Sequence, residues 1–167
     1  MASLTLNGII SYKKDDDYET SKYIWEMLIP FVSKDKTIYD PYFCSGLTKQ
    51  YFNELGYDNV IHNDEDFYTS YMNYDYDIII TNPPFSNKKK VCQILKQIDK
   101  PFIIIAPVST ITKKFWRETF KEGEVSMLIP NGRMQFSKNG KQLDSCWFDC
   151  VFLTYKLNLD KQVIFLD

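Results

Sequence analysis

Short apolar runs alternate with amphipathic stretches along most of the chain, and this alternation predicts an α/β fold. Helical spacing of apolar residues predicts helices over 22–32, 47–56, 91–98 and about 110–120. The runs between them are continuously apolar, as in strands that are buried on both faces. These predicted strands are Thr37–Asp40, Asn59–His62, Tyr76–Thr81 and Pro101–Pro107. Strands that alternate with helices predict a mostly parallel sheet covered on both faces.

The end of the chain breaks this alternation. Two strand-like runs, Val125–Pro130 and Cys146–Leu157, follow one another without a helix between them. We expect them to form an antiparallel pair, with residues 131–141 as a long polar loop. The sequence contains no internal repeat and no linker, so the 167 residues are expected to form a single domain.

Two loops carry unusual residues at the carboxyl ends of predicted strands, Asp40–Gly46 and Asn82–Ser86. Ligands of parallel sheets bind at this edge. In the second loop, Pro83 and Pro84 fix two consecutive φ angles and remove two backbone donors. A strand needs only one proline to end, so this stiffness indicates a site.

Composition narrows the classes of function. Hydrophobic residues make up 44% of the chain and charged residues 25%, which are globular values, and no apolar stretch is long enough to span a membrane. The net charge of −2 argues against a protein that holds nucleic acid by bulk electrostatics. Local basic clusters are interpreted as solvated surfaces unless they surround one site; they are Lys88–Lys90, Lys113 and Lys114 with Arg117, and Arg133 with Lys138 and Lys141.

The four cysteines form no C-x-x-C pair, which predicts reduced thiols and an intracellular protein, in the cytoplasm or nucleus of its host cell. Their spacing, together with His62 as the sole histidine, does not match a zinc site. We therefore expect no metal. Aromatic residues reach 16% of the chain, which suits either a stacking site or a bulky core.

Both unusual loops match motifs of one enzyme family. The stretch YDPYFCSGLTK resembles the first cofactor motif of class I S-adenosylmethionine-dependent methyltransferases, in the Asp-Pro-aromatic form of their amino-methylating branch. The stretch NPPF resembles the catalytic motif of that branch, best known from N6-adenine DNA methyltransferases. The resemblance implies a Rossmann-like methyltransferase sheet and S-adenosylmethionine as cofactor. Tyr76 follows Phe67 by only nine positions, so the usual helix and third strand must be shortened or lost.

The resemblance also assigns residues to the methionine end of the cofactor. Asp40 would accept a hydrogen bond from the α-ammonium, and Gly46 would let the backbone approach the ligand. Tyr42, Phe43 and Ser45 would complete this loop. Where the family often has two glycines, this chain has one, crowded by aromatic residues. Thr20 resembles a threonine that contacts the methionine moiety, although capping of the following helix explains Thr20 nearly as well.

The segment after the second strand would hold the nucleoside end of the cofactor. Asp64 is the candidate for the two ribose hydroxyls, with Asn63 and Glu65 as rivals. Asp66 and Phe67 resemble an acid–aromatic pair that binds the adenine amine and ring. The alternative interpretation is a charged turn without a ligand.

In the catalytic motif, the Asn82 side-chain oxygen and the Pro83 carbonyl would accept hydrogen bonds from the two N–H groups of a flat amine. Pro84 would keep that carbonyl at one angle, and Phe85 would stack on the target base. Four further residues are candidates for nucleic-acid contacts: Ser86, Lys113, Arg133 and Phe136. Arg133 would contact phosphate or base and Phe136 would stack or wedge, unless this stretch is a plain hairpin.

The function that the resemblance implies is methylation of adenine N6 in nucleic acid, with DNA preferred over RNA, as in small phage-type enzymes. Guanine N2 and glutamine side-chain amides are alternative targets, since each presents a planar NH2 group. A catalytically inactive subunit with this fold is a further alternative. No separate target-recognition domain is predicted, so specificity would come from short loops, a second copy of the chain or a partner subunit.

Overall fold

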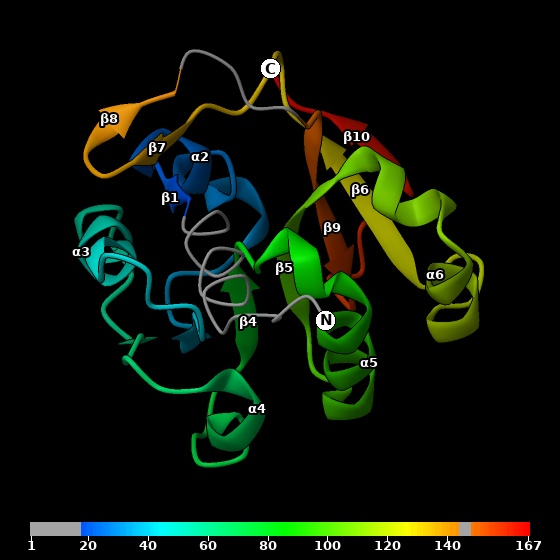
Figure 1. The fold of residues 1–167 in the computed structure, drawn as a ribbon, viewed down its shortest axis with the longest axis horizontal. Coiled ribbons are helices and arrows are strands. Elements are labelled where there is room, and N and C mark those ends of the chain that lie inside the picture. Colours follow the sequence, from blue (N-terminus) through cyan, green and yellow to red (C-terminus); the bar gives the residue numbers. More distant parts are fainter. Residues whose placement is uncertain (1–17, 144–147) are drawn as a thin grey trace, which may run out of the picture.

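The computed structural model describes residues 18–143 and 148–167, which form a seven-stranded sheet in the order β3-β2-β4-β5-β9-β6-β10 (Figure 1). The strands are β2 (Ile38–Tyr39), β3 (Val60–Ile61), β4 (Ile78–Thr81), β5 (Phe102–Pro107), β6 (Val125–Ile129), β9 (Cys150–Tyr155) and β10 (Val163–Phe165). Only β9 runs antiparallel to its neighbours, β5 and β6. The predicted fold class is confirmed: the sheet is Rossmann-like and mostly parallel, with an antiparallel pair near the end of the chain.

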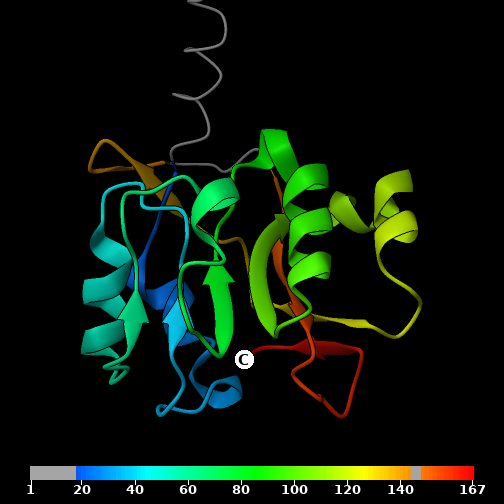
Figure 2. The same cartoon turned by 90° about the horizontal axis from the view of Figure 1, so that it is seen from below.

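Helices cover both faces of this sheet. They are α2 (Lys22–Glu26), α3 (Leu47–Glu54), α4 (Phe67–Ser70), α5 (Lys88–Ile98) and α6 (Lys114–Thr119), with 3-10 helices η1 (Ile29–Phe31), η2 (Phe85–Asn87) and η3 (Val108–Thr112). One core cluster joins α2 and α3 to Ile80, and a second joins α5 and α6 to Ile79, so successive residues of β4 serve opposite faces. Helix α3 lies near the β2–β3 end of the sheet and α6 near the β6–β10 end (Figures 1 and 2).

The middle of the fold is shortened, as predicted. Only the four-residue helix α4 lies between β3 and β4, and the described chain has no strand there. Strand β3 therefore forms one edge of the sheet, and β10, which was not predicted, forms the other. The first predicted helix also breaks after Glu26, and the chain continues as η1 with Pro30, whose nitrogen cannot donate a helical hydrogen bond.

Residues 131–141 do not form the predicted polar loop. Instead, β7 (Phe136–Lys138) and β8 (Lys141–Gln142) form a hairpin, and β7 also pairs with β1 (Glu19–Thr20) in a small antiparallel sheet. Asn139 and Gly140 form the two-residue turn, with φ of +53° and +73°. The pairing of β7 with β1 places Thr20 opposite Phe136, so the hairpin holds the start of the described chain in place.

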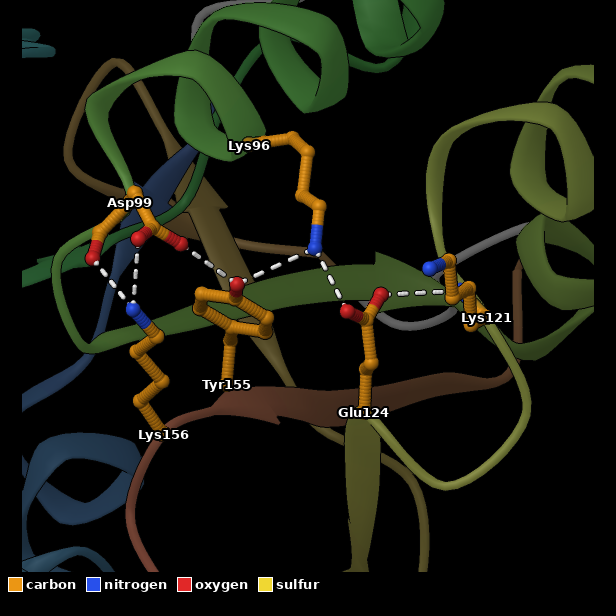
Figure 3. A network of polar contacts seen from close by, with 6 residues as sticks. All are labelled: Lys96, Asp99, Lys121, Glu124, Tyr155 and Lys156. Carbon is orange, nitrogen blue, oxygen red and sulfur yellow. Dashed lines mark hydrogen bonds and ion pairs between the residues drawn. The ribbon is translucent and has the colours of Figure 1, made fainter.

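A network of polar contacts lies at the end of β9 (Figure 3). The Tyr155 hydroxyl, at the end of β9, donates to Asp99 Oδ1 at 2.6 Å and accepts from Lys96 Nζ at 3.1 Å. Lys96 also contacts Glu124 at 2.7 Å, and Lys156 Nζ lies 2.7 Å from Asp99 Oδ2. These contacts join the end of α5 to β9 and to the turn before β6. Among the described residues, no helix has the length and apolar character that crossing a membrane requires.

Candidate active site

A cavity of about 670 Å³ lies at the carboxyl ends of β2, β3 and β4. Its volume is in the range of small-molecule sites. Many of the predicted site residues line it: Thr20, Asp40, Tyr42, Phe43, Ser45, Asp64, Asp66, Phe67, Asn82, Pro84 and Ser86. The structure therefore brings the Asp40–Gly46 loop and the Asn82–Ser86 loop together around one space.

Asp40 links the first loop to β4 by hydrogen bonds. It is only 2% exposed, and its Oδ1 accepts hydrogen bonds from the Thr81 hydroxyl at 2.5 Å and from the Tyr42 N–H at 3.3 Å. Its Oδ2 lies 3.4 Å from His62 Nδ1. Burial raises the pKa of the Asp40 carboxyl, while the nearby His62 and the Thr81 hydroxyl oppose that rise. Asp40 was predicted to bind an ammonium group, but most of its bonding capacity goes to the protein.

Gly46 has a role in the packing of its own loop, and its approach to a ligand stays a prediction. Its φ is +80°, and a Cβ atom there would lie 2.6 Å from the tip of the Phe43 ring. The Phe43 ring also stacks on His62, with centroids 4.9 Å apart. Gly46 is therefore required by the turn and by the Phe43 ring, which fills the space beside it. His62, which sequence analysis considered only as a zinc ligand, supports this ring from the end of β3.

In the segment after β3, hydrogen bonds distinguish the three candidates for a ribose-binding residue, Asn63, Asp64 and Glu65. Asn63 Nδ2 donates to the Tyr74 hydroxyl at 2.9 Å, and that hydroxyl donates to Glu65 at 2.8 Å. Asp64 lines the cavity and makes no side-chain hydrogen bond to the described residues. Of the three side chains, Asp64 is therefore the most available to a ligand.

Asp66 combines the two interpretations that the sequence left open. Its Oδ1 caps α4 by accepting from the Tyr68 N–H at 2.9 Å, as a turn residue would, yet Asp66 also lines the cavity. Phe67 is 2% exposed and packs on Tyr42 with ring centroids 5.6 Å apart. Burial raises the pKa of Tyr42, so its phenol stays neutral.

Asn82 carries one of the buried, unpaired polar atoms of the site. Its Nδ2 donates to Thr20 Oγ1 at 3.0 Å, whereas its Oδ1 is buried and has no hydrogen-bond partner among the described residues. Trp25 Nε1, on another residue of the lining, is likewise buried and unpaired within the described chain. Such groups are costly unless something supplies their partners. Thr20 does not cap α2, since Ser21 occupies the cap position.

The chain after the two prolines continues along the rim. Phe85 meets Phe148 edge-on, with ring centroids 5.7 Å apart, and is not part of the described cavity lining. Asn87 Nδ2 donates to the Tyr68 hydroxyl at 2.8 Å, and both residues line the cavity. This hydrogen bond joins the catalytic-motif loop to α4. Sequence analysis missed both residues because neither belongs to a recognised motif.

Comparisons with known proteins give a partial match. The chain is 40% identical over 57 residues to the type II methyltransferase M.EcoRI of Escherichia coli; this segment is 34% of the chain but only 18% of that protein. No protein-family model matches. The chain superposes on precorrin-6y C5,15-methyltransferase from Geobacter metallireducens with a TM-score of 0.44 and 14% identity, covering 86% of this chain and 96% of that one. For TrmN from Thermus thermophilus the TM-score is 0.40 at 9% identity, with coverages of 78% and 47%.

Three predicted substrate contacts lie outside the described lining. Phe136 is 1% exposed and belongs to the hydrophobic core, so the prediction that it stacks on or wedges between bases is wrong. Arg133 is exposed and its Nε pairs with Asp149 at 2.8 Å, while Lys113 precedes α6. The described lining contains no Lys or Arg. It does contain four acidic residues beside Asp40: Glu19, Asp64, Glu65 and Asp66.

Proposed function

We propose that this protein transfers a methyl group from S-adenosylmethionine to a planar NH2 group, with adenine N6 in DNA as the first candidate target. The observation that carries the proposal is Asn82 Oδ1, a buried acceptor without a partner in the described chain, directly after β4. A buried acceptor that lacks a donor is expensive to maintain. A flat amine would supply the missing N–H.

The cavity residues fit the proposed cofactor. Asp64 is available for ribose hydroxyls, and Asp66 with Phe67 offers an acceptor beside an aromatic ring. Ser45 lines the cavity just before α3, whose first N–H groups favour an anionic group such as a carboxylate. The unpaired Trp25 Nε1 adds a donor. When bound, S-adenosylmethionine supplies an electrophilic methyl group.

The protein's contribution would be to prepare the attacking nitrogen. An exocyclic amine is a poor nucleophile because its lone pair is delocalised into the ring. Asn82 Oδ1 and the Pro83 carbonyl would hold its two protons, which favours a pyramidal nitrogen with a localised lone pair. Pro83 and Pro84 restrict the backbone, so these acceptors are arranged before the reaction. Positioning of this kind accounts for much of the rate of bimolecular transfers.

The choice of target is supported less directly. The similarity to a type II methyltransferase covers a short segment, and the Asp-Pro form of the first motif resembles adenine-methylating enzymes. Guanine N2 and glutamine amides present the same pair of N–H donors. A nucleic acid would meet Lys88, Lys89 and Lys90, which follow the catalytic motif at the start of α5. Recognition of a defined sequence would come from short loops, a second copy of the chain or a partner subunit.

Methyl transfer from tritiated S-adenosylmethionine to DNA, RNA and protein mixtures tests this function. We expect label in DNA adenine, and a loss of roughly 100-fold or more in Asn82→Ala, the usual effect of removing one transition-state hydrogen bond. Asn73→Ala, at an exposed position away from the cavity lining, is the control and should retain full activity. Label in protein amides alone would overturn the adenine target. If no methyl group is transferred and calorimetry detects no cofactor binding, the proposed enzymatic function is wrong.

A further inference from the structure

The geometry points to Thr20 as a positioning residue that holds the Asn82 side chain in place. This inference rests on the proposed function, because it concerns the group that would accept the target amine. An asparagine side chain has two nearly isosteric orientations, which exchange an acceptor for a pair of donors. Only the orientation with Oδ1 at the unpaired position can accept a hydrogen bond from an NH2 group.

The contacts of Asn82 favour that orientation. Thr20 Oγ1 accepts from Asn82 Nδ2 at 3.0 Å, and Thr20 is 5% exposed. A flipped amide would place an NH2 group, with two unpaired protons, where Oδ1 now lies. Buried N–H groups without partners are rarer and costlier than under-satisfied oxygens. A threonine hydroxyl can donate as well as accept, so the surroundings of Oδ1 select the amide orientation, and the hydrogen bond to Thr20 holds the side chain in position.

Thr20 has little freedom to move away. It belongs to β1, where it pairs with Phe136 of β7, and the neighbouring Glu19 pairs with Ser137. Ser21 Oγ donates to the Gln135 carbonyl at 3.3 Å, and the Gln135 N–H donates to the Tyr23 hydroxyl at 2.7 Å. The β7–β8 hairpin is therefore a support for the site.

This role differs from the contact with the cofactor's methionine moiety that the sequence resemblance suggested. A cofactor contact would change the dissociation constant of S-adenosylmethionine. A residue that positions Asn82 would instead change kcat, because the acceptor is used as the nitrogen becomes a nucleophile. The two roles can therefore be separated by measurement.

The first test compares Thr20→Val, which keeps the shape but removes the hydroxyl, with Thr20→Ser, which keeps the hydroxyl. We expect Thr20→Val to lower kcat by roughly 10- to 100-fold, as small misplacements of catalytic groups do. The dissociation constant of S-adenosylmethionine should stay within about threefold, and Thr20→Ser should remain within about threefold of the wild type in both quantities. A weaker cofactor affinity with unchanged kcat would overturn the positioning role.

The second test repeats Thr20→Val in an Asn82→Ala background. Alanine has no side-chain amide, so nothing is left for Thr20 to position. We expect the cost of Thr20→Val to fall to roughly threefold or less in this background, which is a strong coupling between the two positions. An equal cost in both backgrounds would overturn the inference.

A third measurement does not depend on activity. In 15N-labelled protein, the Asn82 side-chain amide signal is assigned by its loss in Asn82→Asp. Thr20→Val should shift this signal, while Thr20→Ser should leave it near its wild-type position. If the wild type transfers no methyl group, the proposed function fails and this measurement still decides the Thr20–Asn82 contact. An unchanged signal in a folded Thr20→Val variant would overturn it.

Discussion

At the scale of single residues, the first loop is organised around an aromatic ring rather than around glycines. Phe43 fills the space beside Gly46 and stacks on His62, while Asp40 beneath them is bound by Thr81. A second glycine in place of Phe43 would leave that space unfilled. Here the ring fills it, and one glycine at φ +80° suffices.

Gly46→Ala tests this packing. The left-handed conformation alone costs an alanine about 1–2 kcal/mol, and the new Cβ would also displace the Phe43 ring. We expect a lower unfolding free energy in denaturant titration and weaker binding of S-adenosylmethionine in calorimetry. Gly123→Ala is a matched control, because its φ is +83° and no atom lies within 4 Å of the added Cβ. It should show the conformational cost without the change in binding.

Asp64 provides the second test at this scale. Its carboxylate has no side-chain partner in the described chain, whereas Glu65 accepts from Tyr74. Loss of a charged hydrogen-bond acceptor costs roughly 1.5–3 kcal/mol, so Asp64→Asn should weaken S-adenosylmethionine binding by at least about tenfold. Glu65→Gln should change it little. Equal effects of both substitutions would argue against a specific ribose contact by Asp64.

At the scale of elements, sequence patterns predicted the seven-stranded sheet better than the small sheet of β1, β7 and β8. Continuous apolar runs identified the buried strands β4 and β5, because a strand buried on both faces leaves little room for polar residues. The β7–β8 hairpin was predicted only as the alternative to a substrate-binding loop, although Asn139-Gly140 is a strong hairpin signal, because its flanking residues are mainly polar. Phe136 was consequently assigned to a substrate although it packs in the core.

The hairpin turn yields a prediction of its own. Asn139 and Gly140 both have positive φ, and Gly140 faces open space. Gly140→Ala should therefore lower the unfolding free energy by about 1–2 kcal/mol through conformational strain alone. Asn139→Gly should cost almost nothing, since glycine is equally suited to this turn. If Gly140→Ala were as stable as Asn139→Gly in urea titrations, the assignment of a two-residue turn to Asn139 and Gly140 would be wrong.

The candidate site shows the same division between what patterns reveal and what packing decides. The two motifs identified Asp40 and Asn82, and the end of the second predicted strand identified Asp64, because strand ends are recognisable in sequence. The contacts that set their roles join distant segments: Thr20 with Asn82, and His62 with Asp40. No pattern within a short window could show them.

At the scale of the whole molecule, the Tyr155 network predicts how stability depends on pH. A hydrogen bond from Lys156, with a second from Tyr155, lowers the pKa of Asp99, and bonds from Lys96 and the Lys121 N–H lower that of Glu124. Carboxyls with a lowered folded-state pKa stabilise the protein above their unfolded pKa, about 4, and lose this contribution as pH falls through the folded value. We therefore expect the midpoint temperature of thermal unfolding to decrease as the pH falls below about 4.

Tyr155→Phe removes the central hydroxyl of this network. The difference in Tm between wild type and Tyr155→Phe should be largest near pH 7 and should shrink as Asp99 becomes protonated at acid pH. Tyr76→Phe is the control, because the Tyr76 hydroxyl donates to a backbone carbonyl and burial raises its pKa to about 12. Its Tm difference should stay constant. Parallel curves for both variants would contradict the role of Asp99.

The acidic lining has a consequence for turnover. A sulfonium donor is a cation, and its demethylated thioether is electrically neutral, whereas Glu19, Asp64, Glu65 and Asp66 surround the cavity without a lysine or arginine from the described lining. Coulombic attraction should hold the spent molecule less tightly than the fresh one. Added salt would screen this attraction and reduce the difference in affinity between the sulfonium donor and its thioether product. The same carboxylates would repel a polyanion, so under the proposed function a nucleic-acid target would place its base in this cavity and keep its phosphates outside.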